Sequence, residues 1–221
     1  MFHLLVFAKE PRPTRVKTRL MPLLGATGAA RLYAAMLRDV ATAVGSWPGG
    51  RTTWVVDGDP DHPAFRGREV WPQGTGDLGD RLERAVARGF REGARTVGVI
   101  GTDCPLLGVE HLGRLFASAG APRTASVIPA EDGGYVALAL GSPCPAAFRG
   151  IAWSTPAVLS QTIEALDGAG FRVTRFPALP DVDTPEDLAK LREALRRDPR
   201  RAPHTARELG GLLREIAHPV P

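Results

Sequence analysis

The chain has 221 residues, 43% of them hydrophobic, a net charge of +4 and only two cysteines. This length suits one large α/β domain or two small ones, and we see no apolar run near the ~20 residues of a membrane span. Two cysteines without a CxxC pair argue against a zinc site. The first residues have no basic region before a short apolar run, so we expect a cytoplasmic protein that begins with a strand.

A basic loop follows the first predicted strand, Phe2 to Ala8. Pro11 and Pro13 interrupt this loop and disfavour a helix. A basic loop at the carboxyl end of a first strand is where α/β proteins bind phosphates, although a solvated charged loop would read the same way. Its cations are Lys9, Arg12, Arg15, Lys17 and Arg19.

The next segments alternate between helical and extended patterns. Apolar spacing predicts a helix from Thr27, its possible cap, to Val44. Strands are expected at Thr52 to Val56 and at Glu69 to Trp71. A glycine-rich loop, residues 73–79, then leads into a helix from Leu78 to Arg91. Its glycines let the backbone approach a flat ligand such as a nucleobase.

A short apolar run, Thr96 to Ile100, predicts a strand buried on both faces, as in the centre of a parallel sheet. Asp103 follows directly. In open α/β sheets ligands bind beyond the carboxyl ends of the strands, where an acid can hold a divalent cation against phosphates. The alternative is that Asp103 only caps the helix that follows, Val109 to Ala117.

A turn of two acids and two glycines, Glu131-Asp132-Gly133-Gly134, lies between two further predicted strands. These strands are Ala125 to Pro129 and Tyr135 to Leu140. The turn is compatible with a simple hairpin. Its acids could also present carboxylates to a substrate.

The last part of the expected domain contains a second acid after a strand. Ser154 or Thr155, with Pro156, predicts a helix start that continues to about Leu166. A strand from Arg172 to Phe176 precedes Asp183, and Thr184 caps the next helix. We expect Asp103 and Asp183 to lie at neighbouring strand ends and to share one metal ion.

The C-terminal residues differ in composition from the rest. A basic, proline-containing stretch, Arg196 to His204, reads as a linker to an amphipathic helix, Thr205 to Ala217. We therefore expect one domain, residues 1–196, followed by a segment, residues 197–221, that packs on this domain or on a partner subunit.

Six short motifs, in this order, resemble a bacterial glycosyltransferase-like family related to the guanylyltransferase of the deazaflavin-cofactor pathway. More distantly they are similar to the molybdenum-cofactor nucleotidyltransferases. The resemblance spans about residues 4 to 190, and Thr14 stands where that family usually has glycine. The motifs begin at Lys9, Gly76, Gly101, Asp132, Trp153 and Asp181.

The resemblance implies a GT-A-like (nucleotide-diphospho-sugar transferase) fold, an α/β architecture with a mostly parallel sheet flanked by helices. It implies Mg²⁺ or Mn²⁺ at Asp103, with Asp183 as second ligand. Lys17 and Arg19 are expected to act on phosphates and Asp132 on an acceptor. The expected nucleotide-binding residues are Ala8, Lys9, Arg12, Arg15, Lys17, Arg19, Gln73, Gly76, Asp77, Leu78 and Gly79. The expected substrate-binding residues are Glu131, Asp132, Gly133, Gly134, Trp153 and Ser154.

Three functions remain open at this point. The first is metal-dependent transfer from a nucleotide-sugar, with Asp132 or Glu131 as base. The second is nucleotidyl transfer from a nucleoside triphosphate to a phosphorylated molecule, which needs further cations such as Arg149, Arg172 and Arg175. The third is a non-catalytic nucleic-acid or regulatory binder, disfavoured because the basic tail lacks aromatic platforms. The expected partners are a nucleotide or nucleotide-sugar and a small-molecule acceptor, with no nucleic acid and no membrane; a homodimer remains open.

Overall fold

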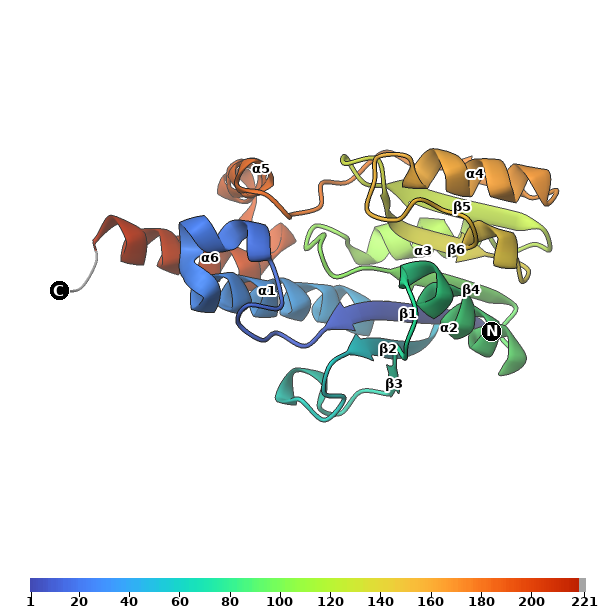
Figure 1. The fold of residues 1–221 in the computed structure, drawn as a ribbon, viewed down its shortest axis with the longest axis horizontal. Coiled ribbons are helices and arrows are strands. Elements are labelled where there is room, and N and C mark those ends of the chain that lie inside the picture. The colour runs from blue at the N-terminus through green and yellow to red at the C-terminus, as the bar shows by residue number, and fades with distance from the viewer. Residues whose placement is uncertain (219–221) are drawn as a thin grey trace.

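The computed structural model describes residues 1–218 and has a single seven-stranded sheet between helices (Figure 1). The strands lie in the order β3-β2-β1-β4-β6-β5-β7, and β6 alone runs antiparallel to its neighbours. The expected α/β fold with a mostly parallel sheet is confirmed. The strands are β1 (Phe2–Lys9), β2 (Gly50–Asp57), β3 (Val70–Pro72), β4 (Thr96–Ile100), β5 (Thr124–Pro129), β6 (Tyr135–Leu140) and β7 (Arg172–Arg175).

Two hydrophobic cores cover the two faces of the sheet. One core packs against α1, α3, α5 and α6, and the other packs against α2 and α4. Alternate residues of β1 supply both: Leu4 and Val6 face the first core, and Leu5 faces the second. This is the period of two that a strand imposes. The helices are α1 (Met21–Gly45), α2 (Leu78–Arg91), α3 (Val109–Ser118), α4 (Val158–Gly168), α5 (Pro185–Arg197) and α6 (Pro203–Ala217).

The order of the strands creates a crevice above β1 and β4. The chain adds β2 and β3 on one side of β1, and then places β4 on the other side. Such a reversal leaves the carboxyl ends of two adjacent strands without a covering connection, which is the usual ligand position in open α/β sheets. Because β6 is antiparallel to β4, it begins, with Tyr135, at the edge of the sheet where β4 ends.

Several elements begin and end where the sequence predicts. Residues Thr96–Ile100 form β4 and are all buried, and Leu78–Arg91 form α2. Asp77 and Asp80 cap α2 reciprocally, as Thr184 and Asp187 cap α5. Local signals of this kind satisfy the free N–H groups of a helix without help from the rest of the fold.

Two predicted helix starts differ from the structure, the first only by an additional turn before Gly25. The helix expected from Thr27 begins at Met21 and is interrupted at Gly25, which adopts φ 69° and ψ 165°. The helix expected from Ser154 or Thr155 begins instead at Val158. Residues 153–156 form a separate turn because Pro156 lies against Gly133, where a Cβ atom would come within 3.0 Å of Pro156. A tertiary contact here outweighs the capping signal.

One helical segment, Thr18–Gly45, is long and apolar enough to cross a membrane, contrary to the estimate from the sequence. It includes α1, and 56% of its most apolar window is buried inside the protein. Its buried residues include Leu32, Met36 and Val40 of the first core. Burial on this scale is that of a core helix in an α/β domain.

The C-terminal segment is more helical than the expected linker. Helix α5 continues to Arg197, a 3₁₀ turn spans Pro199–Arg201, and α6 begins at Pro203. Helix α6 packs along α1 (Figure 1) and buries Leu209 and Leu212. Residues 219–221 of the predicted segment lie outside the described residues.

Candidate active site

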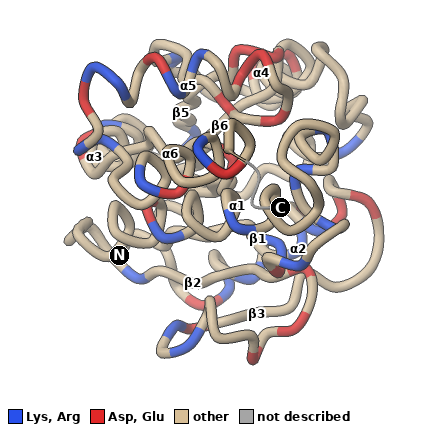
Figure 2. Tube along the Cα trace, turned by 90° about the vertical axis from the view of Figure 1, so that its left-hand side faces the viewer, with Lys and Arg blue, Asp and Glu red and all other residues tan. Residues whose placement is uncertain are grey.

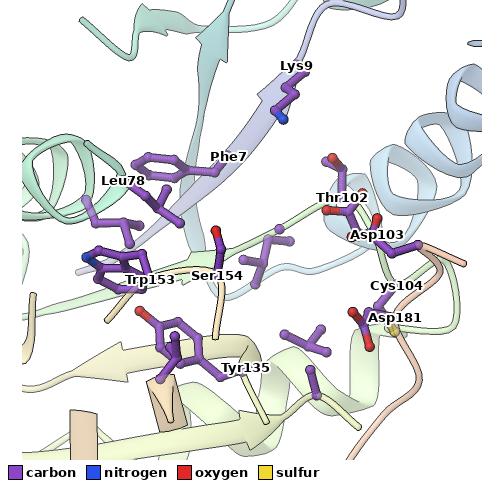
Figure 3. Close-up of a pocket in the computed structure, with 18 of the residues that line it drawn as sticks. Phe7, Lys9, Leu78, Thr102, Asp103, Cys104, Tyr135, Trp153, Ser154 and Asp181 are labelled. Carbon is purple, nitrogen blue, oxygen red and sulfur yellow. The ribbon is translucent and has the colours of Figure 1, made fainter. Parts of the chain in front are cut away.

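A cavity of about 770 Å³ lies at the carboxyl ends of β1 and β4. Its floor is closed by hydrogen bonds that join the two strand ends. The Tyr33 hydroxyl accepts from Lys9 N at 2.9 Å and bonds to Thr102 Oγ1 at 2.8 Å. In Figure 3, Phe7, Leu78 and Trp153 form one side of the cavity, and Asp103 and Asp181 lie on the other. The cavity therefore has an apolar end and an acidic end.

The basic loop reaches the cavity with only some of its cations. Lys9, Lys17 and Arg19 line it, together with Ala8. Arg12 does not; its guanidinium pairs with Glu10 at 2.7 Å, and Glu10 in turn accepts from Asp59 N at 3.1 Å. Arg15 is exposed and is also absent from the lining. Of the predicted phosphate-binding cations, Lys9, Lys17 and Arg19 therefore reach the cavity, and Lys17 is bonded there to Asp103 and Asp183.

Lys17 lies between Asp103 and Asp183. Its Nζ donates to Asp103 Oδ1 and, at 3.0 Å, to Asp183 Oδ1. The two carboxylates, 80 residues apart in the sequence, therefore converge on a single point. Burial alone would lower the pKa of Lys17, but the charges of Asp103 and Asp183 outweigh it and raise that pKa, so Lys17 is a cation.

The Asp103 and Asp183 pair suits a hard divalent ion. Carboxylate oxygens are the ligands that Mg²⁺ prefers, and this ion usually takes one or two of them and completes its shell with water and phosphate. Within residues 1–218 no group of three or more His, Cys, Asp or Glu side chains is placed to hold a metal. Such an ion would accordingly take its remaining ligands from water or from a bound phosphate group.

The route by which Asp183 reaches the cavity differs from the expected one. We expected the two acids at neighbouring strand ends, but β7 is the edge strand, separated from β4 by β5 and β6. The chain after β7 crosses back over the sheet edge (Figure 1), bridging Ala130 with Leu179. Val182 N then donates to Asp103 O at 3.0 Å. This backbone bond fixes the position of Asp183 beside Asp103.

The glycine-rich loop is held by arginines of α2. Arg84 Nη2 donates to Gln73 O at 3.1 Å and to Thr75 O at 2.5 Å, and Arg81 Nε donates to Gly76 O at 3.0 Å. Gln73 lines the cavity, but its amide nitrogen donates to Ala8 O and to Val55 O at 3.2 and 3.1 Å. The loop is thus fixed before any ligand binds.

Three residues of this loop segment, Gly76, Asp77 and Leu78, line the cavity. The carboxylate of Asp77 caps α2. Gly79 is not in the lining, but a Cβ atom there would lie within 3.0 Å of Phe148 O and of the Trp153 indole nitrogen. Glycine at this position is therefore required by the packing of the cavity wall.

The acidic turn between β5 and β6 directs only one of its acids to the cavity. Asp132 and Gly134 line it, and Asp132 Oδ1 accepts from Gly134 N at 2.8 Å. Glu131 points elsewhere and pairs with Lys190 at 2.9 Å. Gly133 adopts φ +93° against Pro156, which supports the turn and lies outside the lining.

The wall beside this turn is aromatic. Trp153 and Tyr135 meet edge to face with ring centroids 6.3 Å apart, and Ser154, at φ +63°, follows in the same wall (Figure 3). Tyr135 Oη is buried and has no hydrogen-bond partner among the described residues. A buried hydroxyl without a partner costs roughly 1–3 kcal/mol. The sequence analysis assigned Tyr135 to a strand and gave it no role, because local patterns do not show which strand residues face the cavity.

Asp181 is a second cavity residue without an assigned role in the sequence analysis. Burial raises its pKa to about 6, and the charges of Asp132, Asp183 and Asp187 add to this effect. It lies in the motif that contains Asp183, so its identity was visible. Its position inside the cavity depends on the crossing segment after β7, which local sequence patterns do not predict.

The replacement of the family's usual glycine by Thr14 changes the backbone conformation of the basic loop little. Thr14 adopts φ +68°, the left-handed conformation that glycine takes readily. The loop therefore keeps a shape that glycine would also support. Threonine at this position carries a conformational strain of about 1–2 kcal/mol.

Comparison with known proteins agrees with this architecture. The family model for uncharacterized proteins conserved in bacteria (DUF2064) matches residues 34–155. The chain is 30% identical to a crystal structure described as a candidate nucleotide-diphospho-sugar transferase from Desulfovibrio desulfuricans G20, with a TM-score of 0.86 and 97% of each chain covered. A search of curated proteins gave no match.

Two more distant structures share the fold. A nucleotidyl transferase from Methanothermobacter is 16% identical, with a TM-score of 0.63 and coverage of 89% of this chain and 98% of that one. A Mycobacterium tuberculosis protein, Rv0371c, solved with manganese, is 19% identical, with a TM-score of 0.52 and coverage of 87% and 98%. At these identities the likeness concerns the fold.

Proposed function

We propose that this chain, an enzyme of the DUF2064 family with the nucleotide-diphospho-sugar transferase fold, transfers a glycosyl group from a nucleotide-sugar to an acceptor hydroxyl with the help of Mg²⁺ or Mn²⁺. One observation carries the choice of reaction. Cations line the cavity near the acid pair, whereas the wall formed by Asp132, Tyr135 and Trp153 offers a carboxylate and aromatic rings. A neutral, hydroxyl-bearing acceptor fits such a wall better than a phosphorylated one.

On the donor side, Lys9 and Arg19 bind the diphosphate. Charge-assisted hydrogen bonds from Lys or Arg to phosphate are the strongest contacts available there. Asp103 and Asp183 would hold the divalent ion, which when bound would supply charge stabilisation for the leaving diphosphate. The base of the nucleotide lies against the fixed backbone of the loop at Gly76.

On the acceptor side, Asp132 is the general base. Its Oδ1 is oriented by Gly134 N at 2.8 Å, which leaves Oδ2 for the acceptor. The acceptor oxygen forms a bond to the anomeric carbon as that carbon's bond to the diphosphate oxygen breaks. The acceptor proton passes to Asp132, and the bonding electrons leave with the nucleoside diphosphate.

Nucleotidyl transfer is the competing reaction and has less support. It needs cations for a phosphorylated acceptor, but Arg149 pairs with Glu83 at 2.5 Å, and neither Arg172 nor Arg175 lines the cavity. The proposed kinship with the deazaflavin-pathway guanylyltransferase rests on the six sequence motifs alone. It would favour this second reaction.

We propose a cytoplasmic enzyme without a nucleic-acid partner. Lys and Arg are interspersed with Asp and Glu along the chain (Figure 2). In the basic tail, Arg196 and Arg197 pair with Glu193, and Arg200 pairs with Asp198. These cations are therefore partly neutralised by their neighbours.

The test is a thermal-shift screen of nucleotide-sugars and nucleoside triphosphates with and without Mn²⁺, followed by turnover of the ligands that stabilise the fold. We expect release of a nucleoside diphosphate. With the donor and acceptor that give turnover, Asp132→Asn should lower the turnover rate roughly 10²–10⁴-fold while donor binding is retained. Glu131→Gln, in the same turn but outside the cavity, is the matched control. Pyrophosphate release from a triphosphate would replace this proposal by nucleotidyl transfer.

A further inference from the structure

Lys17 is buried in an unusual way for a residue of a phosphate-binding loop. Its side chain is 2% exposed, whereas the Asp103 and Asp183 side chains that it contacts are 52% and 49% exposed. The lysine therefore approaches the acid pair from the protein side. The carboxylates face the cavity, and Lys17 lies behind them.

The backbone directs Lys17 to this position. Lys17 adopts φ 49° and ψ 43°, a left-handed conformation that is unfavourable for a residue other than glycine. It immediately precedes the 3₁₀ turn Thr18–Leu20, whose Leu20 is fully buried in the core. Such strain persists only where the surrounding structure imposes it, and it is typical of functional sites.

The charges of the acid pair are only half balanced. Among residues 1–218 no other cationic side chain forms an ion pair with Asp103 or Asp183, so one positive charge faces two negative ones. Two carboxylates this close repel each other unless a cation lies between them. Lys17 supplies that cation in the absence of any ligand.

The same contact opposes a metal ion. A divalent ion that binds both Asp103 Oδ1 and Asp183 Oδ1 must take the place of the ammonium group, or lie next to it and be repelled. A nucleotide changes this balance, because its phosphates offer the ammonium new acceptors and give the metal new ligands.

We propose that Lys17 is a displaceable internal counter-ion that makes metal binding at Asp103 and Asp183 dependent on a nucleotide phosphate. Without nucleotide, the ammonium holds the acid pair together and keeps the divalent ion out. With nucleotide, the ammonium moves to the phosphates and the acid pair receives the metal. The inference rests on the proposed function for the identity of the phosphate ligand, but not for the competition itself.

The experiment measures Mn²⁺ binding to the protein without nucleotide, from the electron paramagnetic resonance signal of free Mn²⁺. We expect Lys17→Met to bind Mn²⁺ at least tenfold more tightly than the unmodified protein. Lys9→Met, which removes a cavity cation that is not bonded to the acids, controls for net charge and should change Mn²⁺ affinity much less. Equal affinities of the unmodified protein and Lys17→Met would overturn the proposal.

A second variant guards against loss of folding in Lys17→Met. Lys17→Arg keeps the charge and can form two parallel bonds to a carboxylate, so it should bind Mn²⁺ more weakly than the unmodified protein. Unchanged Mn²⁺ affinity in this variant would also overturn the proposal.

The coupling between nucleotide and metal is measured by repeating the Mn²⁺ titration with a nucleotide that stabilises the protein in the thermal-shift screen. Nucleotide should tighten Mn²⁺ binding strongly in the unmodified protein and little in Lys17→Met. If no nucleotide or nucleotide-sugar stabilises the protein, the proposed function fails, whereas the Mn²⁺ affinities measured without nucleotide still decide whether Lys17 competes.

Discussion

The active-site cavity and the flank formed by α1 and α6 differ in how fully their acidic side chains are paired. On the flank, Asp39 is 4% exposed and accepts from His204 N, Thr205 N and Thr205 Oγ1 at 3.0, 2.7 and 2.6 Å. A residue of α1 thus caps the first turn of α6, whose own N-cap, Ala202, makes no side-chain bond. In the cavity, Lys17 is the one buried cation among residues 1–218 that pairs with Asp103 and Asp183, and Asp181 forms no ion pair within those residues.

The same contrast holds for the backbone. Four described residues other than glycine have positive φ, and three of them, Thr14, Lys17 and Ser154, belong to loops around the cavity. On the flank, Arg31 bonds to Glu208 at 2.7 Å and to Glu215 at 2.9 Å. The flank is therefore optimised for stability, and the cavity retains strain and unpaired charge that a ligand can relieve.

The largest change in the free energy of unfolding is expected for a substitution on the flank. Asp39→Ala removes the acceptor for three donors in the first turn of α6, two of which, Thr205 N and Thr205 Oγ1, are buried. Unsatisfied buried donors cost roughly 1–3 kcal/mol each before relaxation, so we expect the free energy of unfolding to fall by about 3 kcal/mol. Urea denaturation followed by circular dichroism measures it, and nucleotide binding should be unchanged.

Arg38→Ala provides the control for this variant. Arg38 is the exposed neighbour of Asp39 on α1, and surface substitutions usually change stability by no more than about 0.5 kcal/mol. If the Asp39 and Arg38 variants lose the same stability, α6 does not depend on the Asp39 cap, and the contrast between the two regions is wrong.

The sequence predicted best where local and tertiary preferences agree. The bounds of β4 followed from a short apolar run, and those predicted for α2 agree with the capping box that Asp77 and Asp80 form in the structure. The proximity of Asp103 and Asp183 was also expected, although for a different reason. Both acids were placed at the correct edge of the sheet, because the ends of parallel strands share that edge.

What could not be predicted depends on contacts between distant segments. The sequence indicated that Lys17 faces phosphate, whereas in the structure it contacts Asp103 and Asp183. Its left-handed backbone and its burial arise from packing, which local sequence patterns do not show. The return of the chain after β7 is set by the bridge of Ala130 with Leu179 and by the bond from Val182 N to Asp103 O. The start of α4 depends on Gly133 against Pro156. Patterns with a period of two or 3.6 residues contain no information on such contacts.

In the cavity, removing a charge should stabilise the fold. Burial and the neighbouring acids raise the pKa of Asp181 to about 6 from 3.8, so the folded state disfavours its carboxylate. With a discount for partial exposure to solvent, we expect Asp181→Asn to gain about 1–2 kcal/mol at pH 8 in the presence of a chelator. The measurement is urea denaturation across a pH series.

The pH dependence of the stability gained by Asp181→Asn distinguishes removal of a charge from a packing effect. Because the folded pKa lies above the unfolded value, the gain is complete above pH 6 and declines as the pH falls towards 3.8, where Asp181 is protonated in both states. A gain that stays constant from pH 8 to pH 4 would mean that the unpaired charge of Asp181 is not its cause.

The smallest effect is expected at Thr14, and its sign is the informative part. At φ +68° a threonine pays about 1–2 kcal/mol that glycine does not, while glycine loses about 0.5–1 kcal/mol through the greater freedom of the unfolded chain. Thr14 is exposed, so few contacts are lost. Thr14→Gly should therefore raise the free energy of unfolding by about 0.5 kcal/mol.

Thr18→Gly, the same change in the adjacent 3₁₀ turn, is the control and should lower the free energy of unfolding by about 0.5–1 kcal/mol. Opposite signs in these two variants would locate strain specifically at the rim of the cavity, whereas a loss of stability in both would show that the loop around Thr14 is as relaxed as the flank.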